Sequence, residues 1–257
     1  MSAPKNYQTE AVVIKKTQLG EADRILSLYS PQLGKIQAVA KGVRRSRSKM
    51  AGHLELLTHS LISLVRGRNI DTITGTQTIN SFVPLKTDIR LTSHALYAIE
   101  LVDQFTADHI ENQHLFQLLL GTLKTLCLKN TKELLLRYFE LHLLDEVGYR
   151  PQLQQCVSCR RNLEPTTNLF SYSDGGILCP NCRYCQSTPY PLSLNALKVL
   201  RFLQDSDFTT ANRLILDYEL SCELETVMRG YITHLLEHEV KSFGWLKELR
   251  GRLKEGN

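Results

Sequence analysis

Five cysteines lie close together in the second half of the chain, in a spacing typical of metal ligands. Cys156 and Cys159 form one C-x-x-C pair, Cys179 and Cys182 form a second pair after 19 intervening residues, and Cys185 follows. Each such turn presents two thiolates to one ion, so two turns supply the four ligands of tetrahedral zinc. Few large apolar residues lie between the pairs, so an ion would have to order the segment. Because four protein ligands leave no open position for a substrate, we predict one structural zinc ion. Its predicted ligands are Cys156, Cys159, Cys179 and Cys182, with Cys185 as the substitute for Cys182.

Two other chemistries fit these cysteines less well. The run from Cys179 to Cys185 copies most of the ferredoxin pattern C-x-x-C-x-x-C, but the fourth cysteine, which a proline follows, is missing. Redox-active C-x-x-C pairs lie near βαβ patterns, and neither pair has one around it. The N-terminal residues lack the apolar core of a secretory signal, which favours reduced thiols or metal ligation over disulfides.

The chain contains a partial match to the zinc deaminase motif. His53 and Glu55 with the Cys179–Cys182 pair resemble the pattern H-x-E…P-C-x-x-C. Here the proline follows the first cysteine instead of preceding it, and more than 120 residues separate the two halves. The pattern therefore does not indicate a deaminase.

A hydrolase motif is also incomplete. His234, Glu237 and His238 match H-x-x-E-H, which places two imidazoles on one helical face beside a carboxylate base. Only 19 residues follow His238 to supply a third metal ligand, and the window also continues an apolar helical stripe. No phosphate-binding glycine motif occurs. We predict a binding protein rather than an enzyme, with a metal-dependent hydrolase at these histidines as an alternative.

The excess positive charge of the chain is confined to one short stretch near the N-terminus. The chain has 31 basic and 26 acidic residues, and without seven basic residues of this stretch it would have 24 against 26. No carboxylate interrupts the stretch, which ends before Leu54. Such a block is typical of a surface that meets a polyanion, most often nucleic acid, although a solvated loop or a sorting signal is the simpler alternative. The seven residues are Arg24, Lys35, Lys41, Arg44, Arg45, Arg47 and Lys49.

Composition agrees with a soluble globular protein. The 257 residues are 42% hydrophobic and 22% charged, and no apolar run approaches the length that crosses a bilayer. We expect a cytoplasmic, nucleoid-associated protein.

The first 80 residues predict five short strands, and the remainder is mostly helical. Strands are expected over 9–16, 24–29, 34–40, 56–65 and 70–79, separated by glycine, proline and asparagine turns. Five strands without a helical pattern suggest a small closed barrel, of OB type, although spacing alone does not separate it from an SH3-like barrel. The basic stretch falls mainly between the third and fourth strands.

Helical periodicity begins near Lys86. Apolar stripes over 89–105, 115–123 and 134–147 predict three helices, and stripes over 194–203 and 224–240 predict two more. Thr131 and Ser193 are expected caps, and Gly148 is an expected helix end. We therefore predict an α+β multi-domain chain: an OB-type barrel over 1–82, an α-helical domain over 83–155 and 188–257, and an inserted zinc-binding module over 156–187.

Three long motifs resemble the bacterial RecO family of recombination mediators. They are E-A-D-R-I-L-S-L-Y-S at 21–30, G-K-I-Q-A-V-A-K-G-V-R-R-S-R-S at 34–48, and L-R-Y-F-E-L-H-L-L-D-E-V-G-Y-R-P at 136–151, which the cysteines follow at once. The resemblance covers most of the chain and weakens after about residue 205. It implies an OB barrel, a helical domain and, in many members, a zinc module. It also implies ATP-independent DNA binding and strand annealing, in which single strands are taken from single-strand-binding protein (SSB) and RecR helps to load RecA.

The resemblance and the residues together predict how DNA is held. Only two aromatics, Tyr7 and Tyr29, occur in the first 80 residues, so stacking platforms are scarce. We expect contact through phosphates, steep salt dependence, little sequence preference, and binding of both single and double strands. The predicted contacts are Lys41, Arg44, Arg45 and Arg47 of the family motif A-K-G-x-R-R-S, supported by Lys35, Lys49, Arg66 and Arg68.

The same resemblance places a pocket for the acidic C-terminal tail of SSB in the helical domain. Arg137 matches one of its basic positions, and Lys132 is a second, weaker candidate nearby. The alternative is that Arg137 forms only a surface salt bridge with Glu133 or Glu140.

A zinc-ribbon regulatory factor that binds nucleic acid through the cysteine module is the remaining alternative. Such a module would carry a basic excess. Arg160, Arg161 and Arg183 stand against Glu164 and Asp174, which is a small excess.

Overall fold

The computed structural model describes residues 5–128, 134–182 and 189–244. The chain divides into two compact units, Met1–Lys129 with Val240–Asn257, and Asn130–Glu239. Among the described residues no helix is long and apolar enough to span a membrane. This division into two units does not test the boundaries that we predict for the barrel, the helical domain and the inserted module, which therefore stay predictions.

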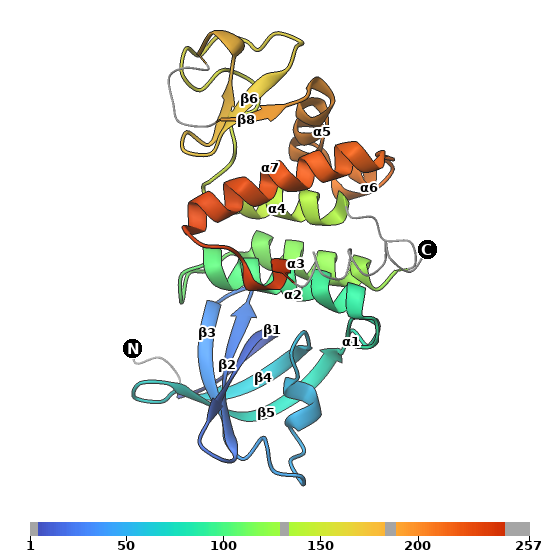
Figure 1. Ribbon diagram of the computed structural model, residues 1–257. Coiled ribbons are helices and arrows are strands. Elements are labelled where there is room, and N and C mark those ends of the chain that lie inside the picture. The colour runs from blue at the N-terminus through green and yellow to red at the C-terminus, as the bar shows by residue number, and fades with distance from the viewer. Residues whose placement is uncertain (1–4, 129–133, 183–188, 245–257) are drawn as a thin grey trace. The chain divides into compact units, whose positions relative to one another are not determined.

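The N-terminal part is a closed five-stranded barrel (Figure 1). Its strands are β1 (Asn6–Leu19), β2 (Asp23–Ser30), β3 (Gly34–Ala40), β4 (His59–Val65) and β5 (Asp71–Asn80). The order around the barrel is β1-β2-β3-β5-β4, with β3 and β5 parallel and the other neighbours antiparallel. Because β5 enters between β3 and β4, the barrel is not a simple meander, and the five predicted strands and the OB type are confirmed.

Alternation along the strands separates a core from an outer face. Inward residues such as Leu26, Leu28 and Ile36 are at most 3% exposed and form one apolar cluster. Residues between them, such as Gln37, point outward. The fourth strand begins later than predicted, because residues 51–54 form a 3₁₀ turn and Leu57 has a left-handed φ of 63°.

Three helices complete the described part of the first unit between the barrel and residue 128. They are α1 (Pro84–Thr87), α2 (Ile89–Phe105) and α3 (Gln113–Leu126). α2 packs against β1 and α3 against β2. The Asp88 side chain accepts hydrogen bonds from two backbone N–H groups and so caps α2. The Glu100 carboxylate of α2 accepts the backbone N–H groups of Lys241 and Ser242, which ties the later segment to this unit.

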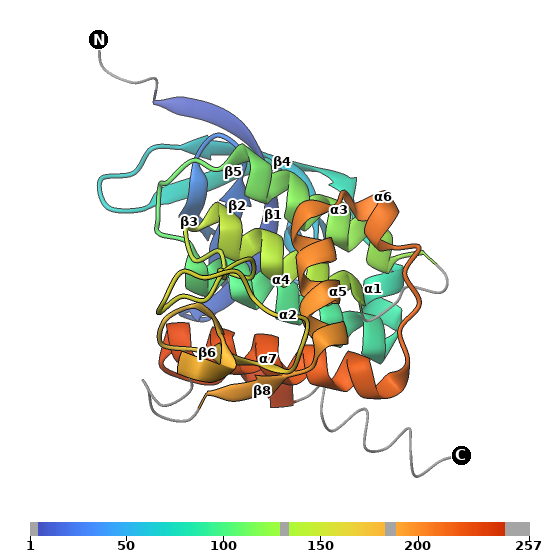
Figure 2. The same ribbon diagram turned by 90° about the horizontal axis from the view of Figure 1, so that it is seen from above.

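The second unit combines helices with a small sheet. Its helices are α4 (Leu134–Glu146), α5 (Leu194–Asp205), α6 (Phe208–Ala211) and α7 (Tyr218–Leu236). Its sheet has the order β7-β6-β8, from β6 (Asn168–Ser171), β7 (Gly176–Leu178) and β8 (Tyr190–Leu192), with a 3₁₀ turn at Pro180–Cys182. α4 packs on α5 and α7, and Figure 2 shows β8 beside α7.

The helix ends of this unit follow the predicted chemistry in part. The Ser193 hydroxyl accepts the Ala196 N–H and caps α5, and Gly148 follows α4 with a φ of 84°. Thr131 lies outside the described residues. α7 ends earlier than predicted, because Glu237 takes a left-handed φ of 60° and stops the helix before Val240.

Candidate nucleic-acid interface and metal centre

The basic connection, residues 41–49 between β3 and β4, presents five cations to solvent. All five side chains are exposed. Within the described part of the chain none of them forms an ion pair with a carboxylate. They are the predicted contacts Lys41, Arg44, Arg45, Arg47 and Lys49.

The backbone of the basic connection is nevertheless held against the barrel. The Gly42 N–H donates to the Asp23 carboxylate at 2.7 Å, and the Arg44 N–H donates to the Ala22 carbonyl at 2.9 Å. The side chain of Val43 is 3% exposed and belongs to the barrel core. Gly42 has a φ of 63°, which only a glycine adopts without strain. The cations therefore project from a fixed backbone, which lowers the ordering cost of binding.

The β4–β5 turn carries the two supporting cations Arg66 and Arg68, both exposed. The Arg66 guanidinium lies over the Tyr7 ring, 5.1 Å from its centroid. The Tyr7 hydroxyl donates to the Asp71 carboxylate, and burial together with this bond raises the pKa of Tyr7.

The barrel offers no aromatic platform for bases in the described residues. Tyr29 is fully buried and packs on Phe116 with ring centroids 6.4 Å apart. Tyr7 is half-buried beneath Arg66. The geometry therefore suits phosphate contact rather than stacking.

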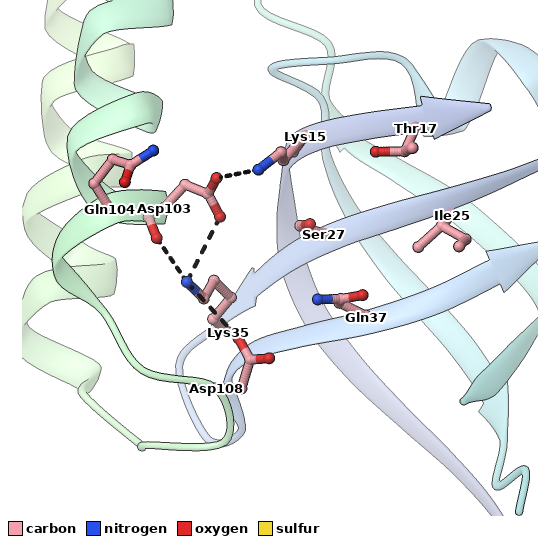
Figure 3. A pocket seen from close by; sticks show the side chains of 9 residues that line it. All are labelled: Lys15, Thr17, Ile25, Ser27, Lys35, Gln37, Asp103, Gln104 and Asp108. Atoms are coloured by element: carbon pink, nitrogen blue, oxygen red, sulfur yellow. Dashed lines mark hydrogen bonds and ion pairs between the residues drawn. The ribbon is translucent and has the colours of Figure 1, made fainter. Parts of the chain in front are cut away.

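Lys35 differs from the other predicted contacts, because its charge is already matched inside the unit (Figure 3). Its Nζ donates to the backbone oxygen of Asp103 at 2.6 Å. It also lies 3.6 Å from Asp103 Oδ1 and 3.7 Å from Asp108 Oδ1, and its side chain is only 13% exposed. Lys35 thus caps the C-terminus of α2, whose last turn contains no cation of its own.

Arg24 of the basic stretch is likewise engaged. Its Nη1 lies 3.4 Å from Glu55 Oε1, and Lys16 contacts the same carboxylate. Burial of Glu55 would raise its pKa, but the hydrogen bond from Lys16 and the charge of Arg24 lower it below the ordinary value. Two of the seven basic residues are therefore held in internal ion pairs, and the remaining five are those of the basic connection.

A pocket of about 420 Å³ lies on the outer face of β1, β2 and β3 beside the end of α2. Sequence reasoning missed it, because its carboxylates lie far from the barrel strands in the chain. The one available signal was the absence of a cation in the last turn of α2, whose carbonyls needed a partner from elsewhere. Its lining residues are Lys15, Thr17, Ile25, Ser27, Lys35, Gln37, Asp103, Gln104 and Asp108.

The predicted zinc ligands come together in the second unit. The Sγ atoms of all four cysteines lie within 4.8 Å of one another, and those of Cys159 and Cys179 are 3.8 Å apart. A Zn–S distance of about 2.3 Å implies about 3.8 Å between sulfurs in a regular tetrahedron, so the set fits one zinc ion. The other two cysteines of the set are Cys156 and Cys182. Cys185, the predicted substitute for Cys182, lies outside the described residues.

Backbone donors prepare this cluster for a metal. Burial alone would raise the pKa of Cys156, but N–H groups of Cys159, Cys179 and Ser158 lower it to about 6. The Ser158 contact would lower the pKa of Cys182, but hydrogen bonds with the other thiols raise it to about 12. The backbone donors thus favour the thiolate form of Cys156, which is the form that binds a metal.

The histidine pair of the hydrolase alternative does not share a helical face. α7 ends at Leu236, so His238 lies beyond the helix that carries His234. In the ranges that the structure describes, the four cysteines are the group of potential ligands found close enough for a metal. His53 of the deaminase pattern instead contacts Thr78 in the barrel, with Nδ1 and Oγ1 2.7 Å apart.

Arg137 is buried in α4. It donates to Glu140 Oε1 at 2.5 Å, and the Glu140 side chain is fully buried. Glu140 is one of the two partners that the simpler alternative names, but the pair is buried and not a surface salt bridge. Lys132 and Glu133 lie outside the described residues.

Two family models match the chain, and the boundary between them follows the barrel instead of the division into two compact units. Residues 1–82 match the family model described as Recombination protein O N terminal, and residues 86–243 match Recombination protein O C terminal. The chain is similar to the DNA repair protein RecO of Dehalococcoides mccartyi strain BAV1, with 46% identity over 250 residues, covering 97% of this chain and 98% of the relative. It is also similar to the DNA repair protein RecO of Roseiflexus sp. strain RS-1, with 40% identity over 96% of this chain and 87% of the relative. For the DNA repair protein RecO of Desulforamulus reducens the identity is 33%, over 95% of each chain.

Proposed function

The chain belongs to the RecO family of DNA repair proteins, and on that premise we propose that it is a DNA-binding recombination mediator without enzymatic activity. It binds single- and double-stranded DNA without ATP and anneals complementary strands. With RecR it helps to load RecA onto strands covered by SSB. The observation that carries this proposal is the set of five exposed cations on a backbone fixed to the barrel.

The basic connection supplies the physical cause of annealing. Two phosphate backbones repel each other, and several cations on one small surface lower that repulsion. Because these cations contact phosphates, the base edges stay available for pairing. The absence of an exposed aromatic platform in the described barrel supports binding with little sequence preference.

The roles of the individual cations follow from their surroundings. Lys41, Arg44, Arg45, Arg47 and Lys49 are the main phosphate contacts. Arg66 and Arg68 support them from the β4–β5 turn. Lys35, which was predicted to support phosphate contact, is bound to the end of α2 and is not a direct contact in this proposal.

The cysteine cluster holds one structural zinc ion in this proposal. Cys156, Cys159, Cys179 and Cys182 would bind it, since their sulfur separations fit a tetrahedron. The ion would supply folding energy to a module whose own apolar cluster is small.

The partner contacts are further proposals from the family. Arg137 and Lys132 are our proposed contacts for the acidic tail of SSB. Because Arg137 is paired with the buried Glu140, a tail that uses Arg137 must compete with this internal carboxylate. We propose a cytoplasmic, nucleoid-associated location, as expected of a partner of chromosomal DNA.

Annealing of complementary oligonucleotides tests the proposal directly. The triple variant Arg44→Ala, Arg45→Ala, Arg47→Ala should anneal far more slowly than the unmodified chain. A control that removes three other exposed arginines, at Arg90, Arg161 and Arg213, changes the net charge equally and should anneal normally. Equal loss in both triple variants, or annealing that the first variant leaves unchanged, would sink the proposal. Arg161 lies in the cysteine module, so the control also tests DNA contact by that module.

A further inference from the structure

We propose that Asp103, assisted by Asp108, acts as an electrostatic barrier that ends the DNA path on the barrel. By matching Lys15 and Lys35, these carboxylates keep phosphates away from the end of the β1–β2–β3 face beside α2. Phosphate contact is thereby confined to the basic connection and the β4–β5 turn. This inference rests on the proposed DNA-binding function and assigns specificity-determining residues to it.

The outer face of β1, β2 and β3, the strip, lies between two differently charged ends. Strand register places Lys15 opposite Ser27 and Ser27 opposite Gln37, so these three side chains form one row across β1, β2 and β3. Lys35 lies one outward position before Gln37 on β3, and Lys41 follows the other end of that strand. One end of this face therefore meets Asp103 of α2 and Asp108, which follows the helix (Figure 3), and the other end leads to the basic connection after β3.

The two ends act independently at physiological salt. Lys35 and Lys41 are six residues apart, which corresponds to about 20 Å at about 3.3 Å per strand residue. The screening length is about 8 Å at 0.15 M salt, so cations at the two ends do not act on the same phosphate. Whether DNA extends along the strip thus depends on the charge at the α2 end itself.

At the α2 end the lysines are already neutralised. Asp103 Oδ2 accepts from Lys15 Nζ at 2.8 Å; the Asp103 side chain is only 14% exposed, whereas the Lys15 side chain is 55% exposed. Asp108 is 48% exposed and adds a negative charge at the mouth of the pocket. Two lysines and two carboxylates leave no net charge, so the lysines offer an arriving phosphate no net attraction, and the phosphate would have to overcome the repulsion of both carboxylates to reach them.

The rest of the pocket offers little to compensate this repulsion. Thr17, Ser27 and Gln37 are neutral hydrogen-bonding groups, and no aromatic side chain lines the pocket. The face therefore lacks the stacking that holds bases on other OB barrels.

Removal of the barrier carboxylate tests the inference. In Asp103→Asn, Lys35 keeps its bond to the backbone oxygen of residue 103 and its pairing with Asp108, whereas the exposed Lys15 loses its carboxylate partner. One or two additional phosphate contacts should tighten binding of a single-stranded oligonucleotide by about 4-fold to 15-fold at 0.15 M salt. The slope of log K against log salt should become steeper by about 0.7 to 1.4.

Two further variants separate the barrier from a general change in charge. Glu219→Gln removes one exposed carboxylate of the other unit and should leave affinity within about twofold of the unmodified chain. In the Asp103→Asn background, Lys15→Met with Lys35→Met should abolish the gain. An Asp103→Asn variant that behaves like Glu219→Gln, or a gain that survives loss of both lysines, would overturn the inference.

The test stays decisive if Asp103→Asn fails to fold. Asp108→Asn changes a half-exposed residue and should give a smaller gain of the same sign, and no gain there would also refute the barrier. Failure of the proposed function looks different, because the unmodified chain would then not bind DNA at all.

Discussion

The barrel carries two groups of cations that look alike in composition and differ in availability. The basic connection holds five exposed cations without a carboxylate partner in the described residues. At the α2 end of the same barrel, Lys15 and Lys35 are matched by Asp103 and Asp108. The difference teaches that, in the function we propose, a cation can contact DNA phosphates only where the fold leaves its charge uncompensated.

Different tasks explain the difference. The lysines of the α2 end bind a helix terminus and two carboxylates, and thereby join the barrel to its helices. The basic connection is joined to the barrel mainly through its backbone instead, with one side-chain bond from Arg44 Nη1 to the Gly20 carbonyl oxygen, so its cations are not matched by carboxylates.

Loss of the metal should have the largest effect of these changes, because it should unfold the cysteine module. It should not change either group of cations on the barrel. We expect one zinc per chain, and none in a variant with Cys156→Ser and Cys159→Ser, because two of four ligands are lost. A structural zinc site contributes about 10–16 kcal/mol in isolated fingers, so the module itself should unfold. Metal analysis and DNA titration measure the two effects, and DNA affinity should change by less than about twofold. A large loss of affinity would place the cysteine module, not the barrel alone, in contact with DNA.

Gly34→Ala should disrupt the packing of β3 against the chain around Ile110, which holds Asp108 beside Lys35. A Cβ at Gly34 would lie 2.0 Å from the carbonyl oxygen of Ile110, and its φ is 62°. We expect a loss of about 3 kcal/mol or more in the free energy of unfolding, measured by denaturant titration. Gly20→Ala is the matched control, since Gly20 has a φ of 59° with no atom within 4 Å of the new Cβ. It should lose only about 1–2 kcal/mol, and equal losses would show that the close approach is unimportant.

Loosening the basic connection should weaken binding moderately. Asp23→Ala removes the acceptor of the Gly42 N–H, whereas Glu21→Ala removes an exposed carboxylate from the same turn. Both changes remove one negative charge, so their difference reports the anchor. We expect Asp23→Ala to bind single strands about 3-fold more weakly than Glu21→Ala, since the connection must then be ordered on binding. Asp23→Asn keeps an acceptor oxygen and should restore the affinity. Identical affinities for the two alanine variants would mean that a fixed backbone is not needed.

Replacing the neutralised lysines should have the smallest effect on DNA binding. Lys15→Met with Lys35→Met keeps the apolar stems and removes two charges that carboxylates already match. Oligonucleotide affinity should stay within about twofold, because no phosphate contact is lost. If affinity falls as it does for the arginines of the basic connection, the two groups are equivalent and the comparison fails.

Much of this architecture could be predicted from local patterns. The five strands follow from alternation and turn residues, Ser193 caps α5 as its side-chain chemistry dictates, and the C-x-x-C spacing predicts the sulfur cluster. Each of these features depends on residues that are near neighbours in the chain or share a spacing rule.

The missing parts depend on contacts between distant residues. Lys35 and Asp103 are 68 positions apart, and nothing local indicates that they meet. The exposure of Lys35 and Arg24 could not be predicted, because both lie in the same carboxylate-free stretch as Arg44 and Arg45. The early end of α7 at Leu236 was also missed, since the apolar stripe continues past Glu237.

The most direct test of phosphate binding by the basic connection is the salt dependence of single-strand affinity. At 0.15 M salt each phosphate contact contributes about 4-fold, so the variant with Arg44→Ala, Arg45→Ala and Arg47→Ala should bind about 50-fold more weakly. Its slope of log K against log salt should be shallower by about 2. Parallel lines for the variant and the unmodified chain, at any difference in affinity, would contradict phosphate contact by these arginines.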